Sequence, residues 1–226
     1  MITHRDQLQL FTLISRQLKK DVECWAFGGT AMMFYGFKGE TKDIDVLFED
    51  DKSKAQFIAV ITGMGFKESS PMGIYIPEKL KDKSKPVMYK REDYRMDLFA
   101  GKIFRTNLSP RMKEDKFAVH DFKDNQTLRI NVFRTEHIVL LKGITERKND
   151  FDDIRTILSK DSHFDWQYLV DEAIWQHEHG DSWVLLDIEK MMQGLKEYML
   201  IEEKYFNQLY KAQGKGRRQG LSNRKP

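Results

Sequence analysis

Two aspartates separated by one residue, Asp43 and Asp45, stand in a stretch that predicts a β-strand over residues 43–48. Because side chains at positions i and i+2 of a strand point to the same face, the two carboxylates are expected to project together. Carboxylate oxygens are ligands that Mg²⁺ takes in proteins, and bound Mg²⁺ bridges readily to substrate phosphates. The pair therefore indicates a site for Mg²⁺, with Mn²⁺ as the alternative ion.

Two consecutive glycines, Gly28 and Gly29, stand just before this pair, between a predicted buried strand at residues 23–27 and a predicted helix at residues 30–35. A bare glycine backbone lets amides approach an anion, and the N-terminus of a helix favours negative charge. The hydroxyl of Thr30 adds a further donor. The three residues predict a cradle for the β- and γ-phosphates of a nucleotide.

A third aspartate, Asp97, lies among apolar residues of a strand predicted over residues 94–99. An unpaired charge would be costly in that setting, which makes Asp97 the natural third metal ligand. Arg95 lies two residues earlier on the same face, where pairing with Asp97 is its simplest role. A phosphate cradle beside carboxylates that bind metal is what nucleotidyl transfer by two ions about 3.5–4 Å apart requires.

The order Gly-Gly, Asp-x-Asp and a lone later Asp resembles the polymerase-β-like nucleotidyltransferase superfamily. The motif Phe27-Gly-Gly-Thr-Ala31, followed by Thr41-Lys-Asp-Ile-Asp45, is most similar to the motifs of a small prokaryotic branch of that superfamily. This branch includes the abortive-infection (type IV toxin–antitoxin) nucleotidyltransferases. The resemblance covers roughly residues 22–160. It implies an NTP-dependent enzyme in which Asp43, Asp45 and Asp97 bind Mg²⁺ and carry the catalysis.

A second patch, Leu141 to Ile154, is similar to a Lys…Arg-x-Lys-Asp…Asp-Leu helix pair of those proteins. The resemblance implies that Lys142 contacts the nucleotide phosphates, and Arg147 and Lys148 are the alternatives for that role. The chain has Asn149 before Asp150 where the relatives often have lysine, which leaves the role of Asp150 open.

The activity that this resemblance implies is transfer of a nucleoside monophosphate from an NTP to an acceptor hydroxyl, which Asp97 would orient or deprotonate. A tRNA 3′ end or a protein side chain is the favoured acceptor, and a small molecule such as an aminoglycoside is the third option. The resemblance further implies a toxin–antitoxin component with a cognate antitoxin. The competing interpretation is a catalytically silent nucleotide- or RNA-binding module of a two-component system.

The amino-acid composition limits the classes of protein to which the chain can belong. Charged residues make up 32% of the 226 residues, mean hydropathy is −0.61, and no apolar run approaches the ~20 residues of a membrane span. The single cysteine, Cys24, excludes an internal disulfide and a cysteine-based zinc site, which favours a cytoplasmic location. Six of the cations lie in the last sixteen residues, which contain no acidic residue, so the net charge of +3 becomes −3 for the remaining chain.

The pattern of apolar residues predicts an α+β fold, in which a mixed β-sheet carries the carboxylates and a C-terminal helical bundle follows. The expected domains are a nucleotidyltransferase core at residues 1–133, a helical domain at 134–212 and a basic disordered tail at 213–226. Besides the elements above, the sequence predicts a strand at 126–133, a loop or hairpin at 71–86, and helices at 5–20, 54–64, 136–144, 150–158, 165–177 and 183–210.

Overall fold

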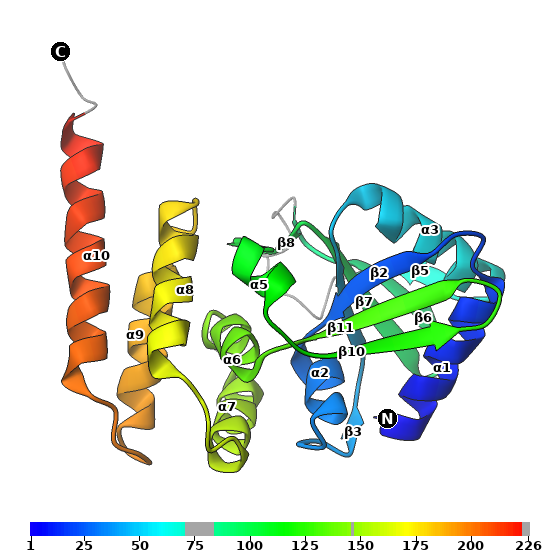
Figure 1. Ribbon diagram of the computed structural model, residues 1–226, viewed down its shortest axis with the longest axis horizontal. Helices are drawn as coiled ribbons and strands as arrows, with labels where there is room; N and C mark the ends of the chain where they lie inside the picture. The colour runs from blue at the N-terminus through cyan, green and yellow to red at the C-terminus, as the bar shows by residue number, and fades with distance from the viewer. Residues whose placement is uncertain (71–83, 146, 223–226) are drawn as a thin grey trace. The chain divides into compact units, whose positions relative to one another are not determined.

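The computed structural model describes residues 1–70, 84–145 and 147–222, with only the backbone described for Lys148 and residues 215–222. The chain divides into two compact units, Met1–Arg134 and Thr135–Pro226 (Figure 1). Most of the loop or hairpin predicted at residues 71–86 lies outside the described residues. Within the described residues, no helix is long and apolar enough to cross a membrane.

In its described residues, the N-terminal unit contains a mixed nine-stranded β-sheet and a separate two-stranded sheet, in which β1 pairs with β3. Its strands are β1 (Ile2–Thr3), β2 (Val22–Ala26), β3 (Glu40–Thr41), β4 (Ile44–Phe48), β5 (Lys67–Ser69), β6 (Val87–Arg91), β7 (Tyr94–Ala100), β8 (Lys102–Ile103), β9 (Thr106–Asn107), β10 (Lys116–Lys123) and β11 (Thr127–Phe133). Its helices are α1 (His4–Gln17), α2 (Gly28–Phe34), α3 (Asp51–Gly63) and α5 (Pro110–Glu114).

The main sheet runs in the order β10-β11-β2-β4-β7-β6-β5, with β8 and β9 attached beside β7. Two neighbouring pairs are parallel, β11 with β2 and β4 with β7, and the other pairs are antiparallel. The parallel pairing of β4 with β7 sets Asp45 opposite Asp97. This pairing brings two strands that lie far apart in the sequence side by side in the sheet.

Strand β4 has one face packed against α3 and an opposite face that carries Asp45 and the buried Leu47. Ile44, Val46 and Phe48 are fully buried, and the ring of Phe48 packs against Phe57 of α3. Asp45 alternates with them and is only partly buried. Because successive side chains of a strand point to opposite faces, Asp45 faces away from α3.

Helix α1 is fixed at its start by its own sequence. Thr3 accepts a hydrogen bond from the backbone N–H of Asp6, and the Asp6 carboxylate accepts one from the Thr3 N–H, which completes a capping box. Its apolar stripe buries Leu10, Phe11 and Ile14. The helix packs on β10 and β11, as Figure 1 shows, and so covers one end of the sheet.

The C-terminal unit is entirely helical in its described part. Its helices are α6 (Thr135–Gly143), α7 (Lys148–Lys160), α8 (Trp166–Glu178), α9 (Val184–Leu195) and α10 (Glu203–Ser222). Helix α6 contacts α7, α8 and α9, and α10 packs beside α8 and α9. A mixed sheet in one unit and helices alone in the other confirm the α+β fold class.

Two predictions for the C-terminal region differ from the structure. The helix expected over residues 183–210 is interrupted between Leu195 and Glu203, although residues 196–202 contain neither glycine nor proline. The chain must turn there for α10 to pack against α8 and α9. The segment 213–226, expected to be a basic disordered tail, contains the end of α10, whose backbone is helical to Ser222 although Gly214, Gly216 and Gly220 are poor helix formers.

Candidate metal and nucleotide site

Asp43, Asp45 and Asp97 lie together on one face of the β4–β7 pair. Each offers a carboxylate oxygen, and these oxygens lie within 4.8 Å of one another. Asp43 directly precedes β4, Asp45 lies within it, and Asp97 is its partner on β7. Asp97 is 1% exposed, whereas Asp43 and Asp45 are partly exposed. The structure thus brings together the three aspartates that the sequence singled out.

The oxygen donors of this triad fit a hard divalent cation. Three carboxylates within one small volume repel each other, and in a partly buried site that repulsion is weakly screened. Mg²⁺ and Mn²⁺ prefer oxygen ligands of this type. Among the residues that the structure describes, these aspartates form the one group of three or more side chains placed to hold a metal ion.

Arg95 lies against the triad. Its guanidinium pairs with the carboxylate of Asp43 through one terminal nitrogen, and its Nε lies 3.2 Å from Oδ1 of Asp97, which is within ion-pair distance but makes no hydrogen bond. The predicted pairing with Asp97 is therefore confirmed. The contact with Asp43 was not predicted, because it depends on β4 and β7 being neighbours in the sheet.

Gly28 and Gly29 pack closely on residues of the site. Gly28 has a φ of +56°, and a Cβ there would lie 2.5 Å from Oδ2 of Asp45. A Cβ on Gly29 would lie 2.3 Å from the hydroxyl oxygen of Thr41, a buried residue to which the sequence analysis assigned no role. Both positions therefore require glycine, since any side chain would displace a neighbour. The preceding residue, Phe27, provides no side-chain cap for α2.

Thr30 connects the start of α2 to the backbone of β4. Its side chain is fully buried, and its hydroxyl oxygen accepts a hydrogen bond of 2.8 Å from the N–H of Asp45. A second bond runs from the N–H of Phe27 to the carbonyl oxygen of Asp45. The Gly-Gly turn and the Asp-x-Asp strand are thus held together at Asp45 itself.

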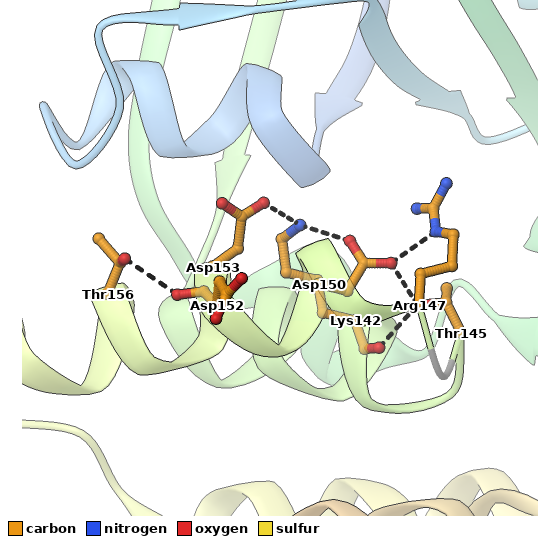
Figure 2. Close-up of polar contacts among 7 residues, drawn as sticks. All are labelled: Lys142, Thr145, Arg147, Asp150, Asp152, Asp153 and Thr156. Atoms are coloured by element: carbon orange, nitrogen blue, oxygen red, sulfur yellow. Dashed lines mark hydrogen bonds and ion pairs between the residues drawn. The ribbon is translucent and has the colours of Figure 1, made fainter.

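Lys142 belongs to the C-terminal unit and is itself paired there. Figure 2 shows its side chain between two carboxylates of α7: Nζ donates to Asp150 at 2.9 Å and to Asp153 at 2.7 Å. The Lys142 side chain is 8% exposed. Its predicted contact with nucleotide phosphates stays a prediction, and its ammonium already has two buried or nearly buried anionic partners.

Asp150 is the centre of this second cluster. It also accepts hydrogen bonds from the hydroxyl of Thr145 and from Nε of Arg147, at 2.6 Å for the latter (Figure 2). Burial raises the pKa of the Asp150 carboxyl, but the charges of Lys142 and Arg147 and the hydrogen bonds outweigh burial and hold that pKa below its ordinary value. The open question about Asp150 receives a structural answer: it is the shared partner of these cations.

Comparison with known proteins gives fold likeness only. No family model matches the sequence, and no curated protein matches it. The solved structure of ANT(2″)-Ia in complex with adenylyl-2″-tobramycin is similar with a TM-score of 0.43 and 12% identity, over 70% of this chain and 88% of that one. A protein from H. pylori provisionally assigned as a nucleotidyltransferase is similar with a TM-score of 0.41 and 13% identity, over 96% of both chains. At such low identities and TM-scores, neither likeness bears on the site residues or substrates of this chain.

Proposed function

We propose that the chain is a metal-dependent nucleotidyltransferase, which moves a nucleoside monophosphate from an NTP to an acceptor hydroxyl and releases pyrophosphate. The observation that carries this proposal is the triad itself: three carboxylates from neighbouring parallel strands offer oxygens within 4.8 Å of one another. The close packing of Gly28 on Asp45 supports it, because it sets a glycine turn directly beside those carboxylates.

The residues of the site divide the work as follows. Asp43 and Asp45 would hold Mg²⁺ or Mn²⁺ from β4, and Asp97 would complete the ligand set from β7. A divalent ion bound there would supply charge neutralisation and Lewis-acid polarisation of the transferred phosphoryl group. Asp97 would in addition orient the acceptor hydroxyl or take its proton. The backbone amides of Gly28 and Gly29 would bind the β- and γ-phosphates, with Thr30 keeping that turn attached to Asp45.

For the acceptor, we propose a hydroxyl of tRNA or of a protein. The six cations of residues 211–226 support the RNA acceptor, because cations that contact phosphates supply affinity without sequence preference. The toxin–antitoxin role, a cognate antitoxin, and a phosphate contact by Lys142 are carried forward as predictions from the family resemblance.

The experiment that tests the transferase proposal is a labelling assay with purified protein, Mg²⁺ or Mn²⁺, each α-³²P-labelled NTP in turn, and bulk tRNA. We expect label on tRNA or on protein, and loss of that label in Asp45→Asn with the fold retained. Asp121→Asn is the matched control, because Asp121 also lies on the sheet but pairs with Arg129 away from the triad. An Asp45→Asn variant that transfers label at the wild-type rate contradicts the proposal.

A second candidate function is a nucleotide- or RNA-binding module without turnover. The observation that favours it is Arg95, since a guanidinium that pairs with two of the three carboxylates is also what a site without metal catalysis would use. NTP binding measured by calorimetry, together with no label from any NTP on tRNA or protein, would favour the module.

A further inference from the structure

Arg95 is placed by the sheet to contact two of the three carboxylates at once. It lies on β7 two residues before Asp97, so both side chains project from the same face. Parallel pairing of β4 with β7 then brings Asp43 within reach of the same guanidinium. The side chains of Arg95 and Asp43 are 22% and 20% exposed, and that of Asp97 is 1% exposed. The contacts are therefore only partly screened by water.

The charge balance of the site follows from these contacts. The triad carries a formal charge of minus three, and Arg95 reduces it to minus two, which one divalent cation neutralises. Without Arg95, the buried carboxylate of Asp97 would lose the cation that lies 3.2 Å from it and would still face the carboxylates of Asp43 and Asp45. Removing one partner of a buried ion pair destabilises a fold strongly, because the remaining charge stays desolvated.

We propose that Arg95 is a positioning residue that keeps the triad assembled before a divalent cation binds and that competes with the cation for Asp43 and Asp97. This inference rests on the proposed function, because it takes the triad to be a metal site. Guanidinium and metal ion both need the same carboxylate oxygens, so binding of the ion requires Arg95 to give up at least part of its pairing. Arg95 therefore lowers the affinity of the site for Mg²⁺ while stabilising the metal-free protein.

The test compares Arg95→Gln with wild type in the full chain, by calorimetric titration with Mg²⁺ and Mn²⁺ and by thermal melting with and without Mg²⁺. We expect Arg95→Gln to bind Mg²⁺ at least about tenfold more tightly, because a positive charge a few ångströms from the ion is removed. Its Tm without Mg²⁺ should fall below that of wild type, and Mg²⁺ should raise its Tm by more than it raises the wild-type Tm.

The matched control is Arg129→Gln, which removes an arginine that pairs with Asp121 on the same sheet. It should leave the Mg²⁺ affinity and the Mg²⁺-induced rise in Tm unchanged. If both variants change the affinity equally, the effect is one of general charge and the proposal for Arg95 is wrong.

The outcomes separate this inference from the function on which it rests. If the wild type binds neither Mg²⁺ nor Mn²⁺, the metal site of the proposed function fails. If the wild type binds Mg²⁺ and Arg95→Gln binds it no more tightly, only the role of Arg95 fails. Should Arg95→Gln not fold, Arg95→Lys decides: it keeps the charge but loses the guanidinium that lies against Asp43 and Asp97 at once, so Mg²⁺ affinity about two- to fivefold tighter is expected, and wild-type affinity overturns the proposal.

Discussion

At the scale of single residues, the site depends on contacts between atoms that cannot be inferred from the residue types alone. The hydroxyl of Thr30 is the clearest case: a fully buried threonine accepts the N–H of Asp45, which is the residue at the centre of the triad. The sequence suggested Thr30 as a donor to phosphate. Its observed bond uses the hydroxyl as an acceptor for the main chain of β4, beside a carboxylate of the triad, and donation to phosphate stays a prediction.

We therefore expect Thr30→Val to lose both stability and transfer activity. Valine has nearly the same shape but leaves the N–H of Asp45 buried without its acceptor, which costs about 1–3 kcal/mol. The free energy of unfolding in urea should fall by that amount, and kcat/KM for label transfer should fall with it. Thr30→Ser, which keeps the hydroxyl, is the control and should lose less of both. Equal stability and activity of Thr30→Val and wild type would sink this role.

At the scale of elements, helices α6 and α7 are held together by a cluster of charges in which Lys142 and Asp150 are buried. Lys142 on α6 pairs with Asp150 and Asp153, one turn apart on α7, and Arg147 joins Asp150 at the start of that helix. A phosphate contact by Lys142 would have to compete with these carboxylates. The sequence alone contained part of the signal for this cluster, because the spacing of Asp150 and Asp153 places both carboxylates on the same face of one helix.

The lowered pKa of Asp150 makes the stability of this helix pair depend on acid. A carboxyl whose pKa is lower in the folded state adds stability above its ordinary value of 3.8, and that stability is lost as pH falls through the lower folded value. We expect the C-terminal unit to lose stability as pH falls below 3.8, and Asp150→Asn to show a flatter dependence after an initial loss of about 1–3 kcal/mol at pH 7.

Tryptophan fluorescence during urea unfolding measures this effect, because Trp166, Trp175 and Trp183 lie in the C-terminal unit and only Trp25 lies in the other. Asp152→Asn serves as the control, since Asp152 lies on the same helix with a more exposed carboxylate that contacts Arg155 at 3.9 Å. A wild type and an Asp150→Asn variant with the same slope below pH 3.8 would contradict the assignment.

At the scale of the whole molecule, the two compact units carry separate spectroscopic and chemical reporters. Cys24, the single cysteine, lies in β2 between β11 and β4 and has no exposed surface. Burial raises the pKa of the Cys24 thiol far above its ordinary value, and the charge of Glu23 adds to that rise. The thiolate that reacts with labelling reagents is therefore suppressed in the folded protein.

We expect Cys24 to react with a thiol reagent at pH 8 only as fast as the N-terminal unit opens. Native protein should show almost no labelling over minutes, and protein in strong denaturant should show one thiol per chain. Along one urea titration, labelling of Cys24 reports the N-terminal unit, and tryptophan fluorescence reports mainly the C-terminal unit, which holds three of the four tryptophans. Rapid labelling of the native protein, with its Tm unchanged, is the result that contradicts the buried position of Cys24.

The sequence by itself determined the α+β class and the elements with strong periodicity, because alternation over residues 43–48 and 94–99 and helical spacing near residues 5–20 reflect burial of one face. It also determined the three aspartates and the two glycines as candidates, because their chemistry and spacing are local. It did not predict β6 and β10. Residues 87–91 of β6 follow a turn-rich segment. In β10 every second residue is exposed, and two of these exposed residues, Phe117 and Val119, are apolar, so apolar residues do not mark the more buried face of that strand.

Only the tertiary structure decided which charges meet. The pairing of Arg95 with Asp43 needs β4 beside β7, and the pairing of Lys142 with Asp153 needs α6 packed on α7. The break between α9 and α10 likewise comes from packing, since no residue in it breaks a helix on its own. Periodicity records which face of an element is buried, whereas contacts between distant residues depend on how elements are arranged in space. That arrangement gives Arg95 and Thr30 their places at the triad.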